Sequence, residues 1–238
     1  EISKRAVTLT SATDSKEYDG TALTNDTITV GGDGFIEGEG ASYDVTGSQK
    51  LVGTSENQFT YTLLPETKAD NYEITLQNGI LEVTGREERY EISVASVSDT
   101  VTYDGELHTL EGLEQTVFTV NGSTYTVEGL TTPGASGIHA GTYSNEITGT
   151  AIVYDSDGND VSDQFLVTAL HGTLEILPVS EPVTVVIREN SAQTRYDGTE
   201  QTLVGYTVDS IDYELYSASD FQFTGEAVVS GTNAGSYD

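Results

Sequence analysis

The chain has 238 residues, and its 39 acidic residues against nine basic ones give a formal net charge of −30. A charge of this size repels nucleic-acid phosphates and anionic membrane surfaces, so neither is expected as a partner, and it favours solubility of an exposed chain. The sequence contains no cysteine, which excludes disulfides and cysteine-based zinc or redox sites. No apolar run is long enough for a membrane-spanning helix, so no membrane insertion is expected.

The tripeptide Tyr-Asp-Gly occurs three times, at residues 18–20, 103–105 and 196–198. The intervals are 85 residues (18 to 103) and 93 residues (103 to 196), which is the length of a small domain. The sequence therefore predicts a tandem array of three repeats. Their predicted bounds are 1–86, 87–179 and 180–238, and the third repeat is expected to be truncated at its C-terminal end.

Each repeat is predicted to begin with a strand. Apolar residues stand eleven and nine positions before the tyrosine in all three copies, as Val7 and Leu9, Ile92 and Val94, and Val185 and Ile187. Their alternation with other residues, largely Thr and Ser, is typical of a half-buried strand.

Tyr-Asp-Gly itself predicts a turn, in which the glycine takes a positive φ and the aspartate bonds its own backbone. Two roles are open for the tyrosines, Tyr18, Tyr103 and Tyr196. They could stack on a sugar ring, or they could pack a corner of the domain and bond the backbone through the hydroxyl group. Because the tyrosine stands beside the same turn in every copy, we expect the corner role.

The first two repeats end in matching blocks, residues 70–83 and 163–176, each with alternating apolar residues around a glycine. Asn78-Gly79 and His171-Gly172 fall between the alternating runs, so each block is predicted to be a β-hairpin. The third repeat has no such block within residues 183–238, and we expect weaker order there because strands of its core are missing.

Short linkers are predicted at residues 85–88 and 178–182, and the two prolines of the second linker restrict its motion further. Turn signals at short intervals and the scarcity of helical periodicity predict an all-β fold. We expect tandem Ig-like β-sandwich domains, with β-grasp-like units, which contain one helix, as the alternative.

One acidic segment, residues 155–160, is a candidate metal site. Asp155, Asp157 and Asn159 place oxygen atoms at alternating positions, as a calcium loop does, and calcium is the only cofactor that the sequence suggests. The segment departs from an EF-hand loop, which requires Gly and Glu where this chain has Asp160 and Leu166. A weak calcium site and a plain acidic connection between two strands are both open.

No pattern in the sequence predicts catalysis. The three histidines, His108, His139 and His171, lack the spacing of metal ligands, and no nucleophile elbow or phosphate-binding loop is present. All four lysines belong to the first repeat, so Lys–Asn cross-links are excluded from the other two. We expect a protein that is not an enzyme.

The blocks Tyr-Asp-Gly-Thr at 18–21, Asp-Asn-Tyr-x-Ile-Thr at 70–75 and Asn-Gly-x-Leu at 78–81 resemble the tandem, mostly-β "MBG-like" repeats of surface proteins in Gram-positive bacteria. The resemblance covers the whole chain and is closest in the first repeat. It implies a secreted, extracellular segment attached to the cell wall through regions outside this sequence, in which neighbouring repeats contact one another. The expected function is a stalk that projects an adhesive or binding domain. The alternative is an adhesin module that itself binds host mucin, matrix protein or glycan.

Overall fold

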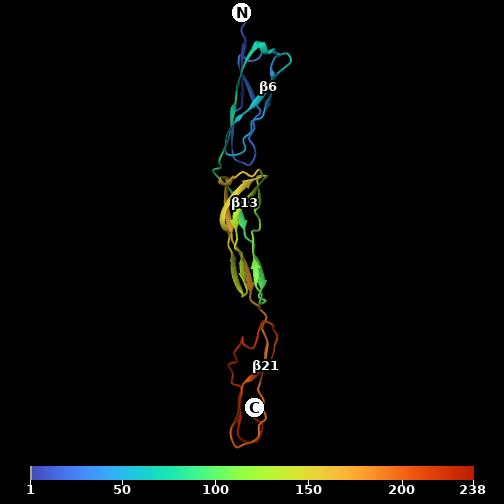
Figure 1. Ribbon diagram of the computed structural model, residues 1–238, viewed down its shortest axis with the longest axis vertical. Helices are drawn as coiled ribbons and strands as arrows, with labels where there is room; N and C mark the ends of the chain where they lie inside the picture. Colours follow the sequence, from blue (N-terminus) through green and yellow to red (C-terminus); the bar gives the residue numbers. More distant parts are fainter. Residues whose placement is uncertain (1) are drawn as a thin grey trace. The chain divides into compact units, whose positions relative to one another are not determined.

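The computed structural model describes residues 2–238, and it is almost entirely β-structure, with 51% of residues in strands and 3% in helices (Figure 1). The helical residues described form two short 3-10 turns, η1 (Ala69–Asn71) and η2 (Ser162–Gln164). Neither turn has the length or the apolar character that crossing a bilayer requires, and the same holds for residues 2–238 as a whole. The predicted all-β class is therefore confirmed, while the assignment to Ig-like sandwiches or to β-grasp units remains a hypothesis.

The described residues form twenty-two strands. Residues 2–86 contain β1 (Arg5–Ser11), β2 (Asp14–Glu17), β3 (Ile28–Gly32), β4 (Ala41–Val45), β5 (Gly53–Asn57), β6 (Phe59–Leu63), β7 (Tyr72–Gln77) and β8 (Gly79–Thr84). Residues 87–179 contain β9 (Tyr90–Ala95), β10 (Asp99–Thr102), β11 (His108–Leu110), β12 (Val117–Val120), β13 (Ser123–Thr131), β14 (Ala135–Gly137), β15 (Gly141–Asn145), β16 (Thr148–Asp155), β17 (Phe165–Leu170) and β18 (Gly172–Leu177). Residues 180–238 contain β19 (Val185–Glu189), β20 (Gln201–Val204), β21 (Tyr206–Ile211) and β22 (Val228–Gly231).

Packing groups these strands into two compact units. The first unit comprises the chain up to Ser98 together with Leu110–Ala135 and Ser144–Thr173, and the second comprises Asp99–Thr109, Ser136–Tyr143 and Leu174–Asp238. The first unit thus joins the whole of the first predicted repeat to part of the second.

The predicted first strands are confirmed as β1, β9 and β19. Val7, Leu9, Ile92 and Val94 are all buried, as their alternation requires. Val185 and Ile187, at the same positions in β19, are only half-buried. Each turn tyrosine follows a further extended segment rather than the first strand itself, and in the first two repeats this segment is a strand, β2 or β10.

The predicted terminal hairpin is wrong, because β7 and β8 do not pair with each other. β7 pairs in parallel with β1, and β8 pairs in parallel with β2. The register is the same in both pairs, since Arg5 faces Tyr72 and Asp14 faces Leu81, a separation of 67 residues each time (72 − 5 and 81 − 14). Residues 5–17 and 72–84 are therefore two long extended segments that run side by side.

The second repeat has the same arrangement. β17 pairs in parallel with β9 from Phe165 and Tyr90 onward, and β18 pairs in parallel with β10 from Leu174 and Asp99 onward, a separation of 75 residues in both pairs (165 − 90 and 174 − 99). The last strand of each repeat thus lies along the first, which gives the fold a high proportion of contacts between residues distant in sequence.

A serine and a glycine explain why each long segment is divided into two strands. Ser11 Oγ accepts a hydrogen bond from Gly79 N (2.9 Å) and donates one to the Asn57 carbonyl oxygen (2.5 Å), so a side chain takes the place of a ladder bond. A Cβ on Gly79 would lie 2.3 Å from the Ala12 carbonyl oxygen. Asn78-Gly79 is consequently no hairpin turn; the glycine is required because a neighbouring backbone approaches closely.

Candidate functional site

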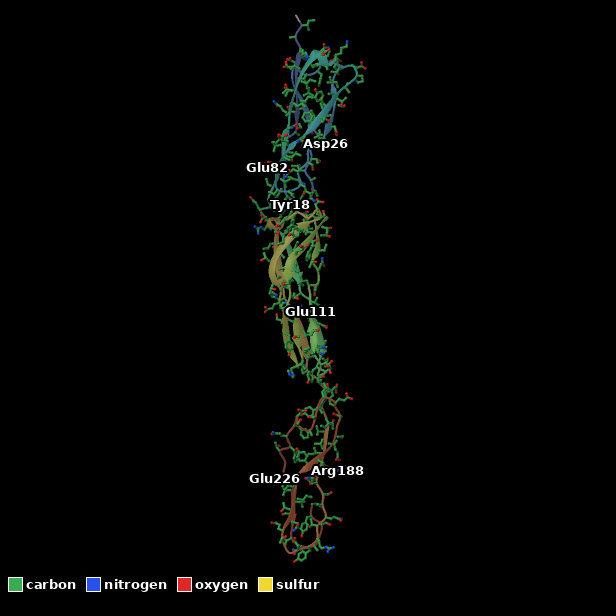
Figure 2. The ribbon with its side chains drawn as sticks, in the orientation of Figure 1. Tyr18, Asp26, Glu82, Glu111, Arg188 and Glu226 are labelled. Carbon is green, nitrogen blue, oxygen red and sulfur yellow. The ribbon has the colours of Figure 1, made fainter. Side chains whose placement is uncertain are left out.

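The residue that departs most from its expected role is Tyr18, at the end of β2. Figure 2 shows it where the last residues of the first repeat's ribbon meet the strands of the second repeat. Its side chain is completely buried (0% exposed), yet its hydroxyl oxygen has no hydrogen-bond partner of good geometry among residues 2–238. The predicted burial is confirmed, and the predicted bond from the hydroxyl group to the backbone is wrong for this tyrosine.

Tyr18 packs instead against Tyr125, a residue of β13 in the second repeat. Tyr125 is 1% exposed, and both tyrosines belong to one buried apolar cluster. Burial, together with the neighbouring Tyr125 hydroxyl group, raises the pKa of Tyr18. The hydroxyl group therefore stays protonated, and the contact carries no charge.

Gly20 completes this contact because its missing side chain leaves room for Tyr125. The glycine has a φ of 84°, and a Cβ on it would lie 2.1 Å from Tyr125 Oη. The tyrosine of the second repeat thus sits directly on the backbone of the first repeat's turn. The turn glycine is fixed by two independent demands, the left-handed backbone and the contact with Tyr125.

The aspartate of the turn holds the loop as the sequence predicts. Asp19 Oδ1 accepts hydrogen bonds from Thr21 N (2.9 Å) and Thr21 Oγ1 (2.7 Å), and it forms an ion pair with Lys16 Nζ at 2.7 Å. Burial opposes ionisation of this carboxyl group, but the Lys16 and Thr21 hydrogen bonds outweigh that effect and lower the pKa of Asp19 to about 2. Asp104 and Asp197 likewise accept a backbone hydrogen bond from the residue two positions on.

The buried cluster around Tyr18 is shared between the two repeats. The first repeat contributes the inward side chains of β8 and the turn, and the second contributes those of β9, β13, β16 and β17. The completely or almost completely buried members are Tyr18, Leu23, Leu81, Val83, Ile92, Val94, Tyr125, Val127, Ile147, Val153, Val161 and Phe165. The first two repeats are thus joined by a common core, and the linker is only part of the connection.

Arg86, in the predicted linker, fastens the polar edge of this junction. Its backbone nitrogen donates to Gln164 Oε1 (2.8 Å), and its guanidinium group pairs with Glu17 (3.0 Å) and lies 4.1 Å from the centre of the Tyr90 ring. One guanidinium nitrogen also donates to the Tyr18 carbonyl oxygen at 3.2 Å. The linker therefore has a fixed conformation, because its basic residue bonds to both repeats.

Lys50 joins the first repeat to the acidic segment of the second. Its Nζ lies 3.1 Å from Asp155 Oδ2 and also contacts Asp157 Oδ2. Asp155 is buried, and it accepts further hydrogen bonds from the backbone nitrogens of Asp157 (3.0 Å) and Asn159 (2.9 Å). Burial opposes ionisation of Asp155, but the hydrogen bonds from Asn159 and Lys50 outweigh it and lower the pKa of this carboxyl group.

The structure thus brings together the three candidate calcium ligands, Asp155, Asp157 and Asn159, but around a lysine. The Asn159 side-chain amide donates to both carboxylate oxygens of Asp155, at 3.1 and 3.2 Å. Within residues 2–238, no group of three or more acidic, histidine or cysteine side chains is arranged to hold a metal ion. Calcium binding remains a hypothesis, and it requires displacement of the Lys50 ammonium group.

A cleft of about 340 Å³ lies at the same junction. Its lining consists of Tyr18, Leu51, Val52 and residues 160–164. Because the Tyr18 ring is fully buried, it offers the cleft no exposed aromatic face of the kind that stacks on a sugar ring.

Other polar residues that the sequence singled out are part of the local structure. His108 Nε2 lies 2.9 Å from Asp104 Oδ1, and His171 Nδ1 accepts a hydrogen bond from Ile147 N at 2.9 Å. The two side chains therefore stabilise a turn and a strand end, respectively.

Comparison with protein-family models and with curated proteins finds no match to this chain. The resemblance to bacterial surface repeats consequently remains a hypothesis that rests on the sequence blocks. The junction was not foreseen from the sequence. Lys50 and Asp157 are 107 residues apart, and no periodicity connects them.

Proposed function

We propose that this chain is a non-catalytic structural stalk or spacer segment of a bacterial cell-surface protein, located outside the cell and attached to the cell wall, which projects an adhesive or binding domain. The observation that supports this proposal is the burial of Tyr18 and Tyr125 in a core that two consecutive repeats share. A spacer must transmit position from one repeat to the next, and a joint with a common apolar core limits bending because bending exposes that core to water.

Charge supports the same proposal. A net charge of −30 keeps a long exposed chain soluble and discourages association between copies. Within this acidic chain, two of the nine basic residues, Lys50 and Arg86, form ion pairs at the junction. Neutralisation is thus concentrated where two repeats meet.

The stiffness of the junction can be measured by spin-label distance measurements. The chain has no cysteine, so Thr60→Cys and Thr168→Cys, at exposed positions in β6 and β17, give a unique label pair on either side of the junction. We expect a single narrow distance distribution, which Tyr125→Ala should broaden because it removes the central side chain of the joint. Tyr43→Ala is the matched control, since Tyr43 packs in the separate cluster of the first repeat.

Two results would contradict the spacer proposal. The first is an equally broad distribution in the parent chain and in Tyr125→Ala, which would mean that the junction does not restrict motion. The second is specific, saturable binding of the purified chain on an array of glycans, mucins and matrix proteins, which would establish the adhesin alternative.

A further inference from the structure

The third repeat has a strand-sized opening where the first two repeats hold their last strand. In the first repeat, β1 lies between β3 and β7, and β8 lies between β2 and β5. In the third repeat, the corresponding sheets contain two strands each, β19-β21 and β20-β22. The strands that correspond to β7 and β8 are the ones without a counterpart in residues 183–238.

The correspondence between repeats follows from backbone hydrogen bonds as well as from sequence. Asn190 N donates to the Gly205 carbonyl oxygen, just as Ala12 N donates to that of Thr27 and Val97 N to that of Gly112. Residues 185–189 therefore correspond to β1, and residues 192–195 to β2. By sequence, Ala234-Gly235 corresponds to the Ala140-Gly141 pair that begins β15.

A groove of about 800 Å³ lies between these two segments. One side is formed by residues 191–194, and the other by residues 229–238. In the first repeat, β8 occupies the equivalent place, with β2 on one side and β5 on the other. The groove thus has the location and the walls of the β8 position.

Burial shows that apolar side chains of the third repeat lack the cover that the last strand gives elsewhere. Val7 and Leu9 are 1% and 0% exposed next to β7, whereas Val185 and Ile187 are half-buried. Tyr196 is 64% exposed, compared with 0% for Tyr18, whose backbone nitrogen donates to the Thr84 carbonyl oxygen of β8. An uncovered strand edge beside apolar side chains is the arrangement that accepts an added strand.

We propose that this groove is a binding site for one extended β-strand of the pattern seen in residues 72–84 and 165–177, which pairs in parallel with residues 185–195. The register observed in the other repeats fixes its contacts. Asp14 faces Leu81 and Asp99 faces Leu174, so Ala192 should face a leucine of the added strand, and Thr194 a valine or isoleucine.

A glycine is required near the middle of the added strand. Cβ atoms on Gly79 and Gly172 would lie 2.3 Å from the carbonyl oxygens of Ala12 and Val97, and Asn190 occupies their position in the third repeat. The third repeat has Glu189 in place of Ser11 and Ser96, and its carboxylate can accept the hydrogen bond that those serines accept from the glycine nitrogen.

The probe is a synthetic peptide with the sequence of residues 70–84, added to the full chain at high ionic strength to screen the acidic charge of both partners. We expect saturable binding by fluorescence anisotropy and slower amide exchange in residues 185–195. At one hundred times the dissociation constant, exchange through opening of the third repeat should slow about 100-fold. Control peptides with Gly79→Val, or with Leu81→Asp and Val83→Asp, should not bind.

A second arm removes the dependence on peptide affinity. Asp238 stands at the position of Glu56, so addition of the sequence of residues 57–84 after Asp238 continues the repeat in register. Residues 183–238 of this longer chain should then match the amide protection of the first repeat. Equal binding of the control peptides, unchanged exchange in the longer chain, or first-repeat protection in the parent chain would overturn the proposal. Protection that rises with protein concentration alone would also overturn it, because a second copy would then fill the edge.

Discussion

The closest contact of the junction, between Gly20 and Tyr125, can be tested by a double-mutant cycle. Gly20→Ala forces a φ of 84° on an L-residue, which costs about 1 kcal/mol, and it places a methyl group 2.1 Å from Tyr125 Oη. Displacement of a buried ring from a filled site adds about 2 kcal/mol. Gly105→Ala is a matched control, because its φ of 83° is the same but its methyl group meets the flexible end of Leu215 at 3.0 Å.

Tyr125→Phe should rescue Gly20→Ala. After Tyr125 Oη, the atoms nearest to a Cβ on Gly20 are those of Ser123, at 2.9 and 3.1 Å, so the tyrosine ring itself is no closer than that. Removal of the hydroxyl group therefore opens the space, and since this group lacks a hydrogen-bond partner of good geometry among the described residues, Tyr125→Phe alone should cost almost nothing.

The measurement is amide exchange resolved by peptide and converted to free energies of opening for residues 5–17 and 123–131. We expect a coupling free energy of about 2 kcal/mol between the two sites. If the effects of Gly20→Ala and Tyr125→Phe simply add, or if Gly20→Ala costs no more than Gly105→Ala, the inferred contact is incorrect.

Three further predictions concern the polar groups of the first two repeats. Ser11→Ala and Ser96→Ala should each destabilise their own repeat by about 1–3 kcal/mol in urea unfolding, because each leaves a buried glycine N–H and a carbonyl oxygen unbonded, whereas Ser42→Ala, on an exposed position of β4, should change little. The folded-state pKa values of Asp19 (about 2) and Asp155 (lowered) lie below the unfolded value of about 3.9, so the stabilisation they provide is complete at neutral pH and is lost as the pH falls from about 4 towards 2; the spin-label distance distribution should broaden in that window, and Asp155→Asn should weaken the dependence. Lys50→Met should raise the calcium affinity of residues 155–159 because it removes the ammonium group that neutralises both carboxylates, and titration calorimetry that shows no heat of binding in either protein would end the calcium hypothesis.

The sequence by itself determined the features that depend on neighbouring residues. The alternation around Val7 and Leu9 fixes a half-buried strand, because side chains on a strand point alternately to its two faces. Tyr-Asp-Gly fixes a turn, because glycine tolerates positive φ and aspartate reaches the backbone two residues on. Both features, and the all-β class that follows from many such short elements, were predictable.

Only the tertiary structure decided what these elements contact. Asn78-Gly79 has the local signature of a hairpin turn, but the close approach of the Ala12 carbonyl oxygen, 67 residues away (79 − 12), makes it part of a long parallel strand. Tyr18 has the signature of a corner tyrosine, but Tyr125 of the next repeat covers it. Such contacts depend on which surfaces meet after the chain has folded, and because they join residues distant in sequence, no local pattern specifies them.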